Sequence, residues 1–206
     1  MSSRLPVFAR RGFIAASIMA FSFFGYGCGG GSNSSFSAQF TPSGTPAGTL
    51  HLIKLVPKTT SGGRVVVQAV IYGPDVTLDM FSFAFDVKIG DPTVLKFVTG
   101  SAVAGDALQA FAGQSITAIV APAMGDASDI VVGVSKLGGG AGNGVANASA
   151  VIVSLTFQVQ KQGTSGLGIS AALAPAVKDS TGATIGAITF DPLGGTVTAI
   201  STGGGY

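Results

Sequence analysis

One short stretch alternates more regularly than any other between apolar and polar side chains. Residues 81–89 read FSFAFDVKI, with large apolar residues at every odd position. Successive side chains of a strand point to opposite faces, so this pattern predicts a half-buried strand. A helix would instead spread the apolar groups around its circumference. The side chains expected on the outer face are Ser82, Ala84, Asp86 and Lys88.

A second stretch, residues 151–159, has the same alternation. Its expected inward residues are Val151, Val153, Leu155, Phe157 and Val159. Two such strands cannot cover their apolar faces alone, so we expect two sheets packed face to face. Further extended stretches are expected at residues 50–56, 64–72, 94–98, 115–121, 130–136, 166–173, 176–178, 184–190 and 196–200.

Turn residues separate these stretches at a regular spacing, which is typical of a β-sandwich of roughly nine or ten strands. Residues 99–114 are rich in Ala and Gly and predict either a short helix or an irregular crossover. Residues 138–149 predict a flexible loop.

Composition supports an all-β chain. There are 32 Gly and no Trp, and all 9 acidic residues are Asp. Glu favours helices, whereas Val, Thr and Gly suit strands and turns, so we expect no helices beyond the N-terminus. The formal charge of +2 includes three Arg within residues 1–27; without them, 8 basic residues face 9 acidic ones. A nearly neutral domain without a basic cluster is not expected to bind nucleic acid.

The N-terminal segment has the features of an export signal. Residues 1–11 contain three Arg and no acidic residue, and residues 12–27 are apolar or small. Such a segment is typical of a secretory signal peptide, and it is shorter than the roughly 20 apolar residues that span a bilayer. The segment resembles a bacterial lipoprotein signal, in which Cys28 would receive the lipid. Gly27 fits that pattern, whereas Gly25 and Tyr26 depart from it.

Alternatives remain open for this segment. Arg10 and Arg11 also resemble a twin-arginine export signal, and Cys28 would be incidental in a simple signal peptide. We expect a signal peptide at 1–27, a flexible Gly/Ser/Pro tether at 28–47, a β-sandwich domain at 48–200 and a flexible tail at 201–206.

The order of four motifs resembles the cohesin domain family and its carbohydrate-binding relatives. The motifs are GGRVVVQAVIY, FSFAFDVKIGDPTVLKF, DIVVGVSK followed by VIVSLTFQVQ, and TSGLGISAALAPAVKDSTGATI. The resemblance implies an antiparallel jelly-roll β-sandwich of about nine strands and a non-catalytic role. Cohesins bind a dockerin module of another protein through one flat sheet face, to which the third strand contributes. Asp86 and Lys88 would then contact the partner; the alternative is a solvated outer face.

The sequence offers little for catalysis. His51 is the only His and Cys28 the only Cys, so a nucleophile–base arrangement and a zinc site both lack residues. No G-x-S-x-G motif is present. Asp75 with Asp79, and Asp126 with Asp129, lie in loops without the ligand order of a calcium loop, and we interpret them as turn residues. We therefore expect no enzyme activity, no catalytic residue, no metal and no cofactor.

Three functions remain open. The first is a lipid-anchored, cohesin-like module that binds a dockerin-like or other envelope protein. The second is a carbohydrate-binding module that binds polysaccharide, although Tyr72 and Tyr206 are the only Tyr after residue 28 and Trp is absent. The third is a purely structural envelope lipoprotein. In each case the chain is exported to the bacterial cell envelope and is held to a membrane only by its N-terminal lipid.

Overall fold

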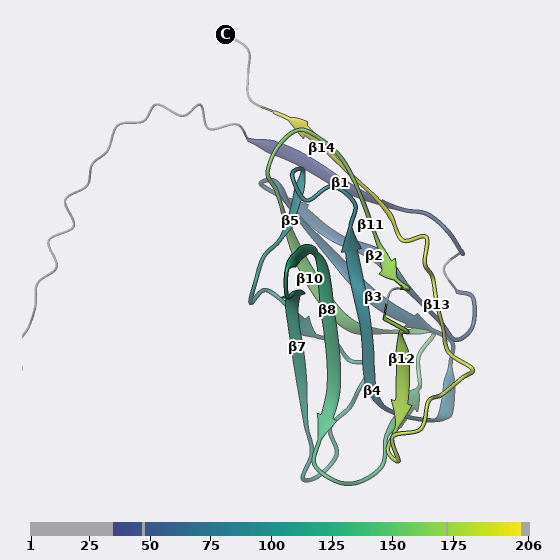
Figure 1. Cartoon of the computed structure of the whole chain (residues 1–206). Coiled ribbons are helices and arrows are strands. Elements are labelled where there is room, and N and C mark those ends of the chain that lie inside the picture. The colour runs from purple at the N-terminus through teal and green to yellow at the C-terminus, as the bar shows by residue number, and fades with distance from the viewer. Residues whose placement is uncertain (1–34, 47, 172, 203–206) are drawn as a thin grey trace, which may run out of the picture. The chain divides into compact units, whose positions relative to one another are not determined.

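Two β-sheets packed face to face make up the described part of the protein (Figure 1). This computed structural model describes residues 35–46, 48–171 and 173–202. The predicted signal peptide, Cys28 and the end of the predicted tail lie outside the described residues.

The larger sheet contains eight strands. Its main path runs in the order β1, β14, β11, β4, β8 and β7, and β12 and β9 also pair with β4. These strands are β1 (Phe36–Pro42), β4 (Asp75–Ile89), β7 (Ser115–Ala123), β8 (Asp126–Leu137), β9 (Asn143–Val145), β11 (Gly163–Ser170), β12 (Ala176–Asp179) and β14 (Gly195–Ser201).

The smaller sheet contains six strands. Its path is β13, β2, β3, β10 and β5, with β6 paired to β10. These strands are β2 (Leu52–Ser61), β3 (Arg64–Tyr72), β5 (Leu95–Phe97), β6 (Val103–Ala104), β10 (Ser149–Val159) and β13 (Thr189–Phe190). The predicted all-β sandwich is confirmed, although the short pairing between β13 and β2 is parallel.

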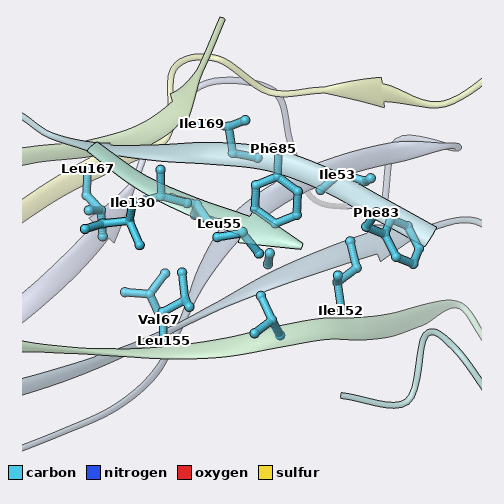
Figure 2. Close-up of a cluster of buried hydrophobic side chains, with 14 of the residues drawn as sticks. Ile53, Leu55, Val67, Phe83, Phe85, Ile130, Ile152, Leu155, Leu167 and Ile169 are labelled. Atoms are coloured by element: carbon cyan, nitrogen blue, oxygen red, sulfur yellow. The ribbon is translucent and has the colours of Figure 1, made fainter. Parts of the chain in front are cut away.

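The core lies between the two sheets, and strand β4 supplies one side of its centre. Phe83, Phe85, Val87 and Ile89 are each at most 3% exposed. They face side chains of the smaller sheet, including Ile53, Leu55 and Leu155 (Figure 2). The prediction that this stretch is half buried, with its odd positions inward, is confirmed from residue 83 onwards.

Two irregularities in strand pairing change which residues reach the core. The register between β12 and β4 shifts next to Met80, and Met80 is fully buried whereas Phe81 is only partly buried. The register between β10 and β3 shifts between Val151 and Val153, and Ile152 becomes buried. A bulge adds a residue to one strand, so the strict alternation that the sequence suggested fails there.

Strand β1 corrects the tether predicted over residues 28–47. Phe36–Pro42 pairs with β14 along its whole length. Phe40 is 1% exposed and lies so close to Gly195 that a Cβ there would approach the Phe40 ring to 2.6 Å. The Gly- and Ser-rich composition predicted a linker, but two apolar residues at alternate positions, Ala38 and Phe40, suffice to attach an edge strand to the core.

A buried ion pair fixes the segment that follows β1. Lys54 Nζ donates a hydrogen bond to the Thr45 carbonyl at 2.5 Å and lies 3.9 Å from Asp191 Oδ2. That same Asp191 oxygen accepts a hydrogen bond from the Thr45 backbone N–H at 2.9 Å. The segment after β1 is therefore joined to β2 and to the residue after β13, and the domain begins well before residue 48.

Replacing Phe40 by Ala tests whether β1 belongs to the domain. Because Phe40 is buried, we expect Phe40→Ala to lower the free energy of unfolding by about 3–5 kcal/mol, measured by urea denaturation of the full chain. Gln39 lies on the exposed side of the same strand, so Gln39→Ala is the matched control and should change stability little. Equal effects of the two substitutions would mean that residues 36–42 act as a linker.

Candidate functional site

The side of the larger sheet that points away from the core is its outer face, formed by β11, β4, β8 and β7. Strand register brings alternate residues of these strands into rows across the face. The rows across β4, β8 and β7 are Ser82, Ser135 and Thr117; Ala84, Gly133 and Ile119; Asp86, Val131 and Ala121; and Lys88 with Asp129. All four residues that the sequence assigned to the outer side of this strand lie there.

The middle of the outer face is flat and apolar. Ile119 is 71% exposed and Val131 is 40% exposed. Their neighbours Ala84, Ala121 and Gly133 have small side chains or none, so little rises above the level of the sheet. Exposed apolar groups gathered on one flat surface are typical of a protein-binding site. The sequence could place Ile119 and Val131 on strands, but not on the same face.

Charged residues gather at one edge of the outer face. Lys88 Nζ lies 2.5 Å from Asp126 Oδ2, and both side chains are about half exposed. The hydrogen bond from Lys88 is the main cause that lowers the pKa of Asp126 to about 2, and Ser128 contributes further. The same bond raises the pKa of Lys88. Sequence analysis named Lys88 but missed Asp126 as its partner, because 38 residues separate them.

Asp86 is on the outer side of β4 yet is only 1% exposed. Its Oδ2 atom, like Oδ1 of Asp129, is buried and has no hydrogen-bond partner among the described residues. Burial raises the pKa of Asp86, and the negative charge of Asp129 raises it further. Asp86 and Lys88 therefore differ: Lys88 reaches solvent, whereas Asp86 lies beneath the surface beside a second carboxylate.

Four acidic residues stabilise turns. Asp75, Asp91, Asp126 and Asp179 each use Oδ1 to accept hydrogen bonds from both the backbone N–H and the hydroxyl of the residue two positions later. This arrangement is the Asx turn with an added side-chain bond. Asp79 accepts hydrogen bonds from Gly142 N–H and Ser180. These hydrogen bonds explain the positions of the carboxylates without a bound ligand.

His, Cys, Asp and Glu side chains do not cluster into a metal site in the described part of the chain. Among the described residues, no three His, Cys, Asp or Glu side chains lie together in a way that could hold a metal ion. His51 Nε2 lies 3.5 Å from Asp75 Oδ2, whose Oδ1 is held by Thr77. The described residues include no helix that is long and apolar enough to cross a membrane.

Two surface grooves of the described residues are large enough to hold part of a ligand or partner. One, of about 310 Å³, lies between β1 and β2 and is lined by residues 37–40 and 57–60. The other, of about 270 Å³, adjoins the outer face where β4 pairs with β11, and Lys88 forms part of its wall.

Comparison with known proteins gives a fold but no family. No family model matches the chain, and neither does any curated protein. The second type II cohesin module of the cellulosomal adaptor scaffoldin of Acetivibrio cellulolyticus has a TM-score of 0.52 at 12% identity, over 71% of this chain and 95% of that module. At this identity the likeness establishes a cohesin-like β-sandwich fold.

Other cohesins of the same organism are similar at lower scores. The type II cohesin dyad of the adaptor scaffoldin has a TM-score of 0.47 at 15% identity, over 72% of this chain and 48% of the dyad, so the chain spans about half of that structure. The sixth cohesin of scaffoldin B, solved in complex with a dockerin, has a TM-score of 0.44 at 17% identity, over 74% of this chain and 94% of that one.

Two substitutions of acidic residues should have opposite effects on stability. The pKa of Asp86 is raised above the ordinary value of 3.8, so the chain loses stability as the pH rises from 3.8 through that raised pKa. The pKa of Asp126 is lowered to about 2, so its charge stabilises the fold above pH 3.8. At pH 7 we expect Asp86→Asn to raise the free energy of unfolding and Asp126→Asn to lower it.

Urea denaturation at pH 7 and at pH 3 measures both effects. Below pH 3.8 the Asp86 carboxyl is protonated in the folded and unfolded states, so the gain from Asp86→Asn should largely disappear. The loss from Asp126→Asn should shrink only as the pH falls from 3.8 toward 2. A loss of stability in Asp86→Asn at pH 7 would contradict the assignment of Asp86 as an uncompensated carboxylate.

Proposed function

We propose that this chain is a non-catalytic, cohesin-like module that binds another protein through the outer face of its larger sheet. The observation that carries the proposal is the flat apolar centre of that face, where Ile119 and Val131 are exposed. A sheet face that is exposed only to solvent would be expected to carry polar side chains at these positions.

The partner class follows from the resemblance of the sequence motifs to cohesins, which bind dockerin modules, and is supported by the cohesin-like fold. We therefore propose a dockerin-like module of another protein as the partner. Lys88 would contact it directly because its ammonium reaches solvent at the edge of the apolar centre. Asp86 is buried below the surface of the outer face, so it would not touch the partner but would add negative charge at that edge.

We further propose that the mature chain is exported and is held at the cell envelope by a lipid on Cys28. The support is the order of basic, apolar and small residues before this cysteine, followed by the Gly- and Ser-rich residues 29–35. A Gly- and Ser-rich composition of this kind suits a tether that holds a domain clear of a membrane surface.

A polysaccharide-binding role is the second candidate, and the groove between β1 and β2 favours it because Ser37, Gln39 and Thr59 line it. Sugar-binding surfaces, however, usually offer an aromatic ring for stacking. Among the aromatic side chains of the described residues, only Phe111 is largely exposed, and it lies elsewhere. Retention on insoluble polysaccharide that Gln39→Ala abolishes would favour this role over the first.

Binding to a panel of recombinant dockerin-like modules from the source organism tests the main proposal. We expect Val131→Asp to weaken binding by about tenfold or more, because a charge would be desolvated in the apolar centre of the interface. Val103 is also exposed but belongs to the smaller sheet, so Val103→Asp is the matched control and should bind as the unmodified chain does. Isothermal titration calorimetry measures both variants.

Three outcomes would count against this proposal. Equal losses in Val131→Asp and Val103→Asp would place the interface elsewhere. Retained binding in both would do the same, and failure of every module to bind would remove the dockerin-like partner. Replacing Asp86 and Lys88 together should also weaken binding, whereas Asp86→Asn alone should have a smaller effect because the Asp86 side chain is buried.

Metabolic labelling with a fatty acid analogue tests the anchor in bacterial cells. Unmodified chain should carry the label and sediment with membranes, and Cys28→Ser should lose the label and move to the soluble fraction, because Cys28 is the only thiol. Ser34→Ala serves as a control that leaves the cysteine in place. Unlabelled wild-type chain would mean a simple signal peptide with an incidental cysteine.

A further inference from the structure

The groove beside the outer face has a floor without side chains. It measures about 270 Å³ and lies where the end of β4 meets β11. Gly168 pairs with Lys88 across these strands, and Gly166 accepts a backbone hydrogen bond from Gly90 at 2.8 Å. All three glycines line the groove, so its floor is bare backbone.

The fold explains two of these glycines but not the third. A Cβ on Gly90 would lie 3.0 Å from the Gly166 nitrogen, and one on Gly168 would lie 3.1 Å from the Pro192 carbonyl oxygen. A Cβ on Gly166 would meet nothing within 4 Å, and Gly166 is not among the glycines with positive φ. Glycine weakens a strand and often marks a place where another molecule approaches the backbone. Gly166 keeps the groove open.

The walls of the groove are apolar on one side and mixed on the other. Pro192 and Leu193 form one wall, and Leu193 is 66% exposed. The stem of Lys88 forms part of the other wall, while its ammonium pairs with Asp126. Pockets for small molecules usually measure roughly 300–1,000 Å³. This groove is smaller and open, and it therefore suits a single apolar side chain rather than a free metabolite.

The rim beside Lys88 carries an excess of negative charge. Asp126 and Asp129 both act on Lys88, so two formal negative charges face one positive charge there. Asp86 Oδ2 and Asp129 Oδ1 are buried and lack a hydrogen-bond partner among the described residues. These two oxygens are out of reach of a partner, whereas the Asp126 side chain is 48% exposed and its carboxylate is open to a second cation. Charge complementarity thus calls for a basic group on whatever fills the groove.

We propose that the groove receives a bulky apolar side chain of the partner protein, and that a neighbouring basic residue of the partner pairs with Asp126 and Asp129. The identity of the occupant as a protein rests on the proposed function. The place and the chemistry of the contact rest on the groove itself, which extends the apolar centre of the outer face toward β11. The partner segment is recognised by an apolar residue followed by a lysine or arginine.

Short peptides provide a probe that does not depend on knowing the partner. Acetyl-Gly-Leu-Lys-Gly-amide should shift the amide signals of Gly90, Gly166 and Gly168 in a nitrogen–proton correlation spectrum of the full chain. The same peptide with Asp in place of Lys, and the one with Ala in place of Leu, should each give less than about half of that shift at equal concentration. These two peptides separate the charge contact from the apolar contact.

Gly166→Leu tests the groove because a Cβ at this position meets nothing within 4 Å and the new side chain would occupy the groove. It should abolish the peptide-induced shifts. Gly186 also has open space around its Cβ position and no positive φ, so Gly186→Leu is the matched control and should keep the shifts. Leu193→Ala, at an exposed position, removes one wall and should reduce them as well. Unchanged spectral dispersion shows that each variant is folded.

The result separates this inference from the proposed function. Peptide shifts that are absent, that occur elsewhere, or that persist in Gly166→Leu overturn the groove as a binding site. Equal shifts with the Lys and Asp peptides overturn the basic partner. If dockerin-like modules bind equally well to Gly166→Leu, the groove fails while the proposed function stands. If the peptide binds in the groove but no module binds, the proposed function fails while the groove stands.

Discussion

The structure depends on the closure of the larger sheet over the smaller one along one face of β4. Four consecutive inward side chains, from Phe83 to Ile89, are at most 3% exposed. Burying each such side chain contributes roughly 1.5–3 kcal/mol, so together they are comparable to the roughly 5–15 kcal/mol by which a typical domain is stable. Because side chains alternate, fixing this face inward also fixes Ser82, Ala84, Asp86 and Lys88 outward. The core and the candidate binding surface are two sides of one constraint.

The alternation of apolar residues predicted the fold class and most of the long strands. It predicted β3 at its observed bounds and the inward side of β4 from Phe83 onwards. It failed where pairing is irregular, since no local pattern shows that Ile152 rather than Val151 turns inward at a bulge. It also failed for β1, because a strand of seven residues needs only Ala38 and Phe40 to attach to the core. Composition cannot distinguish such a strand from a linker.

The outer face was less predictable than the core. The sequence named Lys88 correctly as a residue on that side, but its partner Asp126 comes from β8 and is visible only once the strands are paired. Asp86 illustrates a second limit: alternation places a side chain on a face but does not tell how deeply its neighbours cover it. The apolar centre required Ile119 of β7 and Val131 of β8 to lie in neighbouring rows of one face, and register alone decides that.

The outer face carries several features that stability alone would not favour. An uncompensated buried carboxylate at Asp86 and an exposed Ile119 each cost the isolated chain free energy. A glycine at position 166 weakens β11 although a larger side chain would fit there. These three lie on one face, whereas the inward face of the same sheet is densely packed. The proposed protein partner would recover part of this cost by covering Ile119 and the open backbone at Gly166, whereas the buried Asp86 oxygen stays out of its reach.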